Sequence, residues 1–388
     1  MIRNAQKPIL ALDIAPMGER QHTGIANVAK HLALEMLSDD SVDARFFMIR
    51  GEIPRRTVEQ LVELSCGDIL WWLARRLDAK PTFNVAQERL HIGIFTAVKY
   101  YRRLFPFEVQ IVHDLTTITA PQTHTAESVA HWQDHLLGDI LSSDLVVTVS
   151  ESTRTDLHDF FPATRKIPSL VAHLASCVRA TPLGAAENRL ADYVLVLGTL
   201  EPRKNVRLVL ECLSNYPELL ALKTFVFVGR WGWGGDVRGL ISDLGLASYL
   251  SAGRIVFTGF VEDELRDQLI AAAQLVLYPS RYEGFGLPVL EALGLGVPVL
   301  TSYCASLPEV GGDVAYYCDM DSPPALYKAL IAIFAEQSDN DFRHKQREAC
   351  QVWAQRFSWK QTYRKIRDVA LELVDKEQAP KDAASAAI

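Results

Sequence analysis

Short apolar runs alternate with helical patterns along almost the whole chain, and the runs are rich in Val, Ile and Leu. Such runs are typical of strands buried on both faces of a parallel sheet. In the first half we predict strands at Ile9–Ile14, Ala44–Ile49, Val109–His113, Leu145–Val149 and Leu170–His173. In the second half we predict strands at Tyr193–Leu197, Phe225–Val228, Ile255–Thr258, Leu275–Tyr278 and Val297–Thr301. Helical stretches between many of these runs indicate an α/β fold with two parallel sheets.

The alternation stops in the middle of the chain. Residues Ala175–Ala191 lack apolar periodicity and contain Pro182 and Gly184, so we interpret this stretch as an interdomain linker. We therefore expect a Rossmann-like domain at 1–175, a linker at 176–190 and a second Rossmann-like domain at 191–356. A long amphipathic helix is expected at 357–376, followed by a disordered tail at 377–388.

Composition narrows the class of protein. A chain of 388 residues with 49% hydrophobic residues can build two or three domains. Its net charge of −7 argues against general binding of nucleic acids. The chain has no apolar run long enough to span a bilayer, and its first residues are typical of a strand rather than a signal peptide. The six cysteines lack metal-binding spacing, so we expect reduced thiols and a cytoplasmic protein.

Candidate ligand contacts follow the predicted strands of the first half. Gly18 and Gly24 lie between the first strand and an amphipathic helix, where a glycine loop either approaches a ligand or forms an ordinary turn. His113 ends the predicted third strand, and ligands of open parallel sheets bind beyond the carboxyl ends of strands. A histidine there can exchange hydrogen bonds with a ligand near neutral pH, or be satisfied by the next loop.

A basic pair follows the first strand of the second half. In the run Gly198–Asn205, Arg203 and Lys204 precede a predicted helix, and adjacent cations in this position suit a diphosphate. The alternative is a solvent-exposed basic pair. Gly229 and the pair Gly259-Phe260 close the next two strands, where loops either surround a bound base or make plain turns.

The stretch Arg281–Glu291, RYEGFGLPVLE, combines a glycine loop with two spaced carboxylates. Glu283 and Glu291 stand eight positions apart, with Gly284 and Gly286 before a predicted helix. Glycines at a helix start leave N–H groups open to a phosphate. If most of the span is helical, it covers about 12 Å, comparable to the length from sugar to ribose in a nucleotide-diphosphate sugar. The alternative is a glycine-containing crossover between a strand and a helix.

Two motifs suggest metal binding only weakly. Asp319-Met320-Asp321 has the DxD pattern, but a helix begins directly after it, which favours a helix cap. His131 and His135 share a helix face, but HWQDH has neither the HExxH order nor a third ligand nearby. We therefore predict no metal site.

Taken together, these motifs resemble the retaining glycosyltransferases of family 4, most densely over residues 191–320. The resemblance rests on Gly24, His113, Gly198–Asn205, Gly229, Gly259-Phe260, the Glu283–Glu291 motif and Ser358-Trp359. It implies the GT-B fold, in which two Rossmann-like domains face each other across a cleft and a C-terminal helix crosses back to the first domain. One departure is the run Gly24-Ile25-Ala26-Asn27, where the family often has a basic or aromatic residue.

The resemblance also implies roles for individual residues. Arg203 and Lys204 would bind the donor diphosphate, Glu291 the ribose and Glu283 the transferred sugar, with His113 beside the sugar or acceptor. The catalytic residues would be His113, Glu283, Arg203 and Lys204. The donor-binding residues would be Gly24, Gly198, Arg203, Lys204, Gly229, Phe260, Glu283, Gly284, Phe285, Gly286, Leu287 and Glu291.

The EPRKN form of the basic run looks most like bacterial mannosyltransferases that build surface polysaccharide from GDP-mannose. The resemblance implies retention of configuration, a glycan or polyprenyl-diphosphate-linked acceptor, and no cofactor or metal. Alternatives are a transferase using UDP- or dTDP-sugars, a nucleotide-sugar epimerase, a phosphorylase and a non-catalytic nucleotide-sugar-binding partner.

Residues 70–103 are unusually basic and aromatic. They contain seven Lys or Arg residues and two acids, a balance of +5 by subtraction. Aromatic side chains between these cations favour peripheral contact with the inner face of a membrane through helical segments. The alternative is that the aromatic residues belong to the core and the cations to a solvated face.

Overall fold

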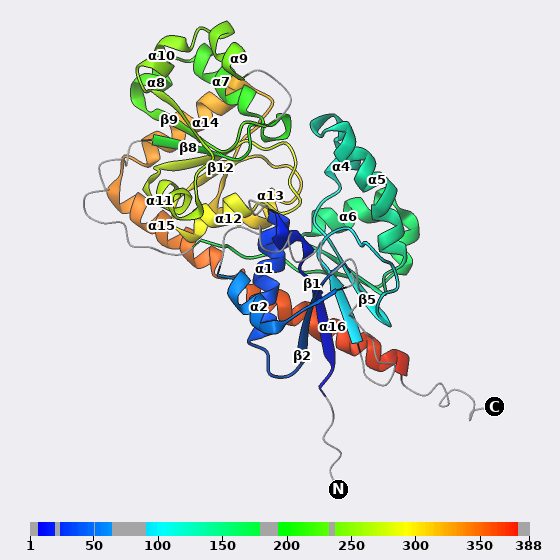
Figure 1. The fold of residues 1–388 in the computed structure, drawn as a ribbon. Coiled ribbons are helices and arrows are strands. Elements are labelled where there is room, and N and C mark those ends of the chain that lie inside the picture. The colour runs from blue at the N-terminus through cyan, green and yellow to red at the C-terminus, as the bar shows by residue number, and fades with distance from the viewer. Residues whose placement is uncertain are drawn as a thin grey trace, which may run out of the picture.

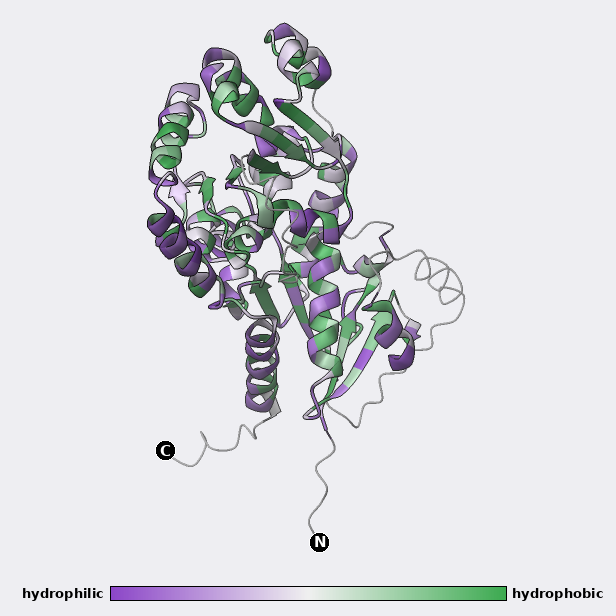
Figure 2. Cartoon of the chain, turned by 90° about the vertical axis from the view of Figure 1, so that its left-hand side faces the viewer, coloured by the Kyte–Doolittle hydropathy of each residue, from purple (hydrophilic) through white to green (hydrophobic). Residues whose placement is uncertain are grey.

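The computed structural model of the chain describes residues 7–19, 24–49, 51–63, 91–178, 193–232 and 237–378. These residues form two α/β units, each built around one sheet, as Figure 1 shows. This arrangement confirms the predicted fold class. Figure 2 shows that the strands are mainly hydrophobic, whereas the helices also carry hydrophilic residues.

The first sheet has the strand order β3-β2-β1-β4-β5-β6-β7. All described pairings are parallel except that of β3 with β2. Its strands are β1 (Ile9–Asp13), β2 (Asp43–Met48), β3 (Gly51–Ile53), β4 (His91–Phe95), β5 (Phe107–Val112), β6 (Leu145–Thr148) and β7 (Ser169–Val171). Its helices are α1 (Gly24–Leu37), α2 (Arg55–Leu61), α4 (Thr116–Thr119), α5 (Ala126–Leu141) and α6 (Glu151–Phe160).

The second sheet has the order β10-β9-β8-β11-β12-β13, and all its described pairings are parallel. Its strands are β8 (Tyr193–Leu197), β9 (Thr224–Val228), β10 (Ile255–Gly259), β11 (Leu275–Tyr278), β12 (Val299–Thr301) and β13 (Tyr316–Tyr317). Its helices are α7 (Val206–Asn215), α8 (Glu218–Leu222), α9 (Val237–Asp243), α10 (Ala247–Ser251), α11 (Asp263–Ala272), α12 (Leu287–Gly294), α13 (Leu307–Gly311), α14 (Pro323–Glu336) and α15 (Asn340–Ala354).

The last helix, α16 (Trp359–Gln378), leaves the second unit and packs on the first, as the red segment in Figure 1 shows. The Trp359 ring stacks on His31 of α1 at 4.7 Å, and the Tyr363 hydroxyl donates to Asp39 at 2.7 Å. The predicted crossover helix is therefore confirmed. It extends through Gln378, so residues 377 and 378 are helical rather than part of a disordered tail, and 379–388 lie outside the described residues.

All ten predicted strands are present, with ends shifted by no more than two residues. Within the described residues, three further strands were missed, namely β3, β4 and β13. Two of these are very short, but β4 is a central strand within the segment that we expected to be helical. A five-residue apolar run next to basic and aromatic residues does not by itself distinguish a strand from a helix.

The structure also corrects the prediction of helical segments across residues 91–103. Phe95 is a core residue of β4, and the Lys99 side chain is fully buried in an ion pair with Glu108 at 2.8 Å. Arg102 and Arg103 pair with Asp139 and Asp144. Residues 70–90 lie outside the described part of the chain. Within the described ranges, each helix is either too short or too polar to cross a bilayer.

Candidate functional site

The carboxyl edges of the two sheets meet at the loop that connects β11 with α12. A Cβ on Gly284 in this loop would lie 1.9 Å from the backbone oxygen of His113, directly after β5. No side chain fits there, so glycine is required for this close approach of the two units. Because the strands of the second sheet are parallel, the residues that follow β8, β9, β10 and β11 share this edge.

Three predicted residues form one buried ion-pair cluster at this edge. Arg203 donates to Oε2 of Glu283 at 2.7 Å, and the Lys204 Nζ donates to Oε1 at 2.5 Å. Arg203 and Lys204 end the turn after β8, while Glu283 lies in the loop after β11. The backbone N–H of Arg281 donates to the Arg203 oxygen at 2.9 Å, which fixes the two loops together.

Residues around Glu283 that the sequence analysis did not identify complete the cluster. The hydroxyls of Tyr278 and Ser280 donate to Oε1 of Glu283 at 2.8 and 2.5 Å. Glu201 accepts from the Arg203 guanidinium at 2.8 Å. Oε1 therefore receives three donors and Oε2 receives one, so Oε2 keeps capacity to accept a further hydroxyl.

The charges of the cluster control its titration. Burial would raise the pKa of Glu283, but Lys204 and Arg203 outweigh it and hold this pKa at about 2. Burial lowers the pKa of Lys204, and the attraction of Glu283 opposes that shift. The Glu283 carboxylate is therefore ionised at neutral pH and held between two cations.

A glycine directly precedes the start of α12, as the sequence predicted. Gly286 is its N-cap with φ +102°, and a Cβ there would lie 2.8 Å from Leu307. Leu287 is the first helical residue, and its side chain would lie 4.0 Å from a Cβ added to Gly24 of the first unit. Because α12 begins only at Leu287, our length estimate applies only to the second half of the span from Glu283 to Glu291.

Glu291 lies in the middle of α12 and is buried. Among the described residues its carboxylate accepts no hydrogen bond, and its ion-pair partner is Arg266 of α11 at 3.8 Å. Burial raises the pKa of Glu291, an effect that Arg266 opposes. Its oxygens therefore retain acceptor capacity for ligand hydroxyls.

The remaining predicted contacts divide into two groups. Gly198 has φ +126° beside Lys204, and a Cβ on Gly229 would lie 2.0 Å from the Gly198 oxygen, so both glycines allow the close approach of two loops at this edge. Phe260 is exposed, with the Arg230 guanidinium 5.4 Å from its ring. The Phe285 side chain, in contrast, packs in the interface near His173 and Phe357, so only its backbone lies in the loop.

His113 lies at the carboxyl end of β5, as predicted. Its Nε2 is 2.7 Å from the Thr96 oxygen, and burial lowers its pKa. A neutral ring that donates from Nε2 to this oxygen leaves Nδ1 as a hydrogen-bond acceptor. The side chain is thus held by its own unit, while its backbone contacts Gly284.

The weak metal motifs gain no support from the described residues, which contain no group of three or more His, Cys, Asp or Glu side chains placed to hold an ion. Asp321 pairs with Arg281 at 3.0 Å, and Ser322 next to it caps α14. The ring centroids of His131 and His135 are 5.1 Å apart, and the two rings are tilted by 47°.

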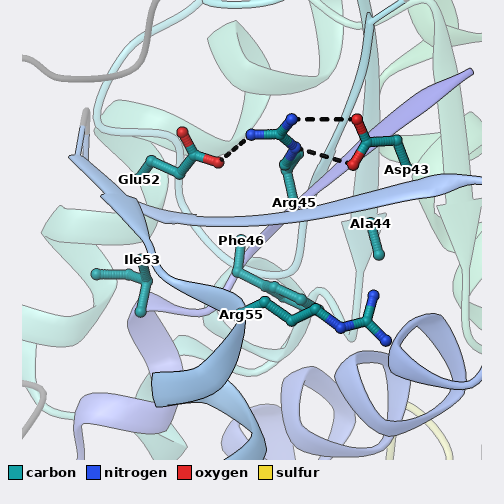
Figure 3. Close-up of a pocket in the computed structure, with 7 residues that line it drawn as sticks. All are labelled: Asp43, Ala44, Arg45, Phe46, Glu52, Ile53 and Arg55. Carbon is teal, nitrogen blue, oxygen red and sulfur yellow. Dashed lines mark hydrogen bonds and ion pairs between the residues drawn. The ribbon is translucent and has the colours of Figure 1, made fainter.

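A surface hollow of about 240 Å³ lies elsewhere, over β2 and β3. In Figure 3 Arg45 lies between Asp43 and Glu52 and pairs with both, at 2.9 and 2.8 Å. Asp43 begins β2, so the hollow is at the opposite edge of the first sheet from His113. Its charged side chains all hold ion pairs, that of Arg55 with Glu59 of α2, and we assign no chemistry to it.

Comparison with known proteins finds similar glycosyltransferases. The profile of glycosyl transferases group 1 matches residues 191–336. O-antigen chain mannosyltransferase B of Escherichia coli is 32% identical over 260 residues, which cover 65% of this chain and 66% of that protein. The serotype-specific mannosyltransferase WbdA of Escherichia coli is 32% identical over 181 residues, which cover 44% of this chain and 20% of that protein.

A solved structure shows the same fold. Anabaena Alr3699/HepE, in complex with UDP and glucose, has a TM-score of 0.63 against this chain at 17% identity, and the match covers 94% of this chain and 99% of that one. Its low identity supports the architecture alone. The profile over the second unit and the mannosyltransferase relatives show that this chain is similar to the group 1 glycosyl transferases, and its two-sheet architecture is the GT-B fold.

Proposed function

We propose that the protein is a retaining hexosyltransferase that moves mannose from GDP-mannose to a hydroxyl of a growing surface polysaccharide. The observation that carries the proposal is the cluster of Arg203, Lys204 and Glu283 beside the start of α12. The choice of mannose rests on the names of the two relatives, both of which are mannosyltransferases.

Charge explains how the cluster would serve the reaction. As the bond between the anomeric carbon and the diphosphate breaks, negative charge accumulates on the leaving diphosphate. Arg203, Lys204 and the N–H groups at the start of α12 would stabilise that charge, which is the role of fixed donors at a developing anion. Oε2 of Glu283 would accept a hydroxyl of the transferred sugar, and Glu291 would accept the ribose hydroxyls.

We infer retention of configuration from the family resemblance. The acceptor oxygen attacks the anomeric carbon on the face that the diphosphate leaves, and the hydroxyl proton passes to a leaving phosphate oxygen. The bond from the acceptor oxygen to the anomeric carbon forms as the bond to the diphosphate breaks, and the O–H bond of the acceptor is replaced by one on the phosphate, with no cofactor required. Activity is therefore expected to survive EDTA, measured as transfer before and after chelation, and loss that Mn²⁺ or Mg²⁺ restores would contradict this.

The proposed acceptor is a glycan or a polyprenyl-diphosphate-linked glycan at the inner face of the membrane. Peripheral contact with that membrane depends on residues 70–90, because Lys99, Arg102 and Arg103 already hold ion pairs. Co-sedimentation with anionic liposomes at low and high salt tests it, since a surface contact of this kind weakens with salt.

The decisive experiment has two stages. A thermal-shift series with GDP, UDP and dTDP identifies the base, because a ligand of the folded state raises the unfolding midpoint with its occupancy. Incubation of the protein with the matching sugar nucleotide and a polysaccharide acceptor then measures transfer by mass spectrometry. GDP stabilisation with mannose transfer is expected. Preference for UDP or dTDP would change the donor, sugar interconversion would indicate an epimerase, and binding without turnover would contradict a transferase.

A further inference from the structure

A carboxylate of the second unit caps a helix of the first. Glu309 of α13 accepts from the backbone N–H groups of Glu151 and Ser152, both at 2.8 Å, at the start of α6. His173, two residues after β7, places its Nε2 3.2 Å from the same carboxylate. More than 130 residues separate Glu309 from each of these partners along the chain.

This arrangement stabilises the carboxylate and the helix together. The first N–H groups of a helix have no partner within it, and its N-terminus attracts negative charge. Ser150 accepts from Thr153 N at 3.0 Å, and Glu309 takes the two N–H groups before it. Burial alone would raise the pKa of Glu309. The hydrogen bonds that its carboxylate accepts from His173 and from the two backbone N–H groups outweigh burial, so the pKa of Glu309 is lowered. The cap is therefore an ionised, charge-assisted contact.

Further contacts bring α6 against the loop Glu283–Gly286, which we call the donor loop. The Thr153 hydroxyl donates to the Gly284 oxygen at 3.2 Å. The Tyr282 hydroxyl, next to the donor loop, bonds Asp156 on the following turn of α6. These bonds lie beside the close approach of Gly284 to His113.

The segment that carries Glu309 is itself tied to the donor loop. The Ser306 hydroxyl is within hydrogen-bond distance of two backbone carbonyl oxygens, that of Glu283 at 2.9 Å and that of Phe285 at 2.8 Å. Leu307 fills the space beside Gly286. A displacement of α13 from α6 would therefore disturb the loop that holds Glu283.

We propose that Glu309 is an interdomain latch. Its carboxylate, held by α6 and His173, keeps the carboxyl edges of the two sheets together and sets the donor loop against His113. Glu309 contacts no proposed substrate, so it acts as a positioning residue. The kinetic part of this inference rests on the proposed transfer reaction, whereas the structural part does not.

The structural test is amide hydrogen exchange of the full chain, followed over residues 150–153. In Glu309→Ala we expect these amides to exchange at least tenfold faster than in the wild type, since opening of the cap no longer breaks a charge-assisted bond. Glu309→Gln keeps one acceptor oxygen and should be intermediate. Equal exchange in wild type and Glu309→Ala would overturn the latch.

A matched control exists on α15. Glu348 also pairs with a histidine, His344, at 3.6 Å, but both are exposed and lie on one helix. Glu348→Ala should leave exchange at 150–153 unchanged. If it accelerates that exchange as Glu309→Ala does, the effect is general and the proposal fails.

The kinetic test separates positioning from simple loss of structure. The proposed diphosphate and ribose contacts come from the second unit, so GDP affinity of Glu309→Ala should stay within twofold of the wild type while kcat falls at least tenfold. Thr153→Val should lower kcat in the same direction by less. An unchanged kcat would overturn the proposal. A weaker affinity for GDP together with a lower unfolding midpoint would also overturn it. A wild type inactive with every sugar nucleotide would refute the proposed function, while the exchange result would still decide the latch.

Discussion

Each unit contains a buried ion pair between a lysine and a glutamate, and the two pairs differ in their access to solvent. Lys99 and Glu108 in the first unit have side-chain exposures of 0% each. Lys204 and Glu283 in the second have 13% and 9%. Glu108 lies near the amino end of β5, whereas Glu283 lies beyond the carboxyl end of β11. The same chemistry thus occurs at opposite edges of two parallel sheets.

The partners of the two pairs also differ. Glu108 accepts from Lys99 and from the backbone N–H groups of Leu104 and Phe105, and Lys99 also reaches Ser143 at 2.7 Å. That pair is sealed within its own unit. The other pair includes a second cation, Arg203, and Glu283, which keeps acceptor capacity, lies in the loop at the edge where the units meet. A closed network serves stability, and an open one can exchange partners with a ligand.

The largest effect should come from breaking the sealed pair. Glu108→Ala leaves Lys99 charged and buried without its carboxylate, which costs about 3–5 kcal/mol. At roughly 2–4 °C per kcal/mol for a domain of this size, the unfolding midpoint should fall by about 6–20 °C. The midpoint is measured by calorimetry. Arg103→Ala, which breaks an exposed pair, serves as the control and should cost no more than about 1 kcal/mol.

The open pair should affect turnover more than stability. Arg203→Ala and Lys204→Ala each remove a charge-assisted contact of about 1.5–3 kcal/mol to the proposed diphosphate. We therefore expect kcat/KM for the donor to fall roughly tenfold to a hundredfold, measured by initial rates. Arg207→Ala, an exposed arginine on α7, is the matched control. Normal kinetics in both site variants would remove these cations from the site.

The two glutamates of the motif should separate in kinetics. Glu291→Ala should raise the dissociation constant of the donor more than it lowers kcat, because its proposed partner is the ribose. Glu283→Ala should mainly lower kcat, because it lies at the proposed reacting sugar. Titration of donor binding, together with single-turnover rates, distinguishes the two. Similar losses of binding in both variants would contradict the assignment.

The smallest effects concern pH, and here the two glutamates should differ in sign. The pKa of Glu283 is lowered from 4.5 to about 2, so its ionisation stabilises the fold above pH 4.5, and this is lost as the pH falls towards 2. The pKa of Glu291 is raised, so its ionisation destabilises the fold as the pH rises above 4.5. Unfolding midpoints of Glu283→Gln and Glu291→Gln from pH 3 to 8 test this. Midpoint differences from the wild type that follow the same pH trend in both variants would contradict it.

The sequence by itself determined the fold class and most of the strands. Strands such as Tyr193–Leu197 and Leu275–Tyr278 are buried on both faces, so each is a continuous apolar run that local pattern reveals. The glycines and charged residues at the strand ends also marked Arg203, Lys204 and Glu283 as candidate ligand contacts, and parallel strands bring their carboxyl ends to one edge.

Tertiary structure alone decided the contacts between distant segments. It placed Lys99 in the core beside Glu108, turned the Phe285 side chain into the interface and brought Glu309 to the start of α6. Local pattern gives the same expectation for a buried and a solvated lysine, since that difference depends on a partner elsewhere in the fold. The span from Glu283 to Arg203 is 80 residues, and only the packing of β8 beside β11 makes them neighbours. Such pairings depend on the geometry of whole sheets, which no short stretch of sequence contains.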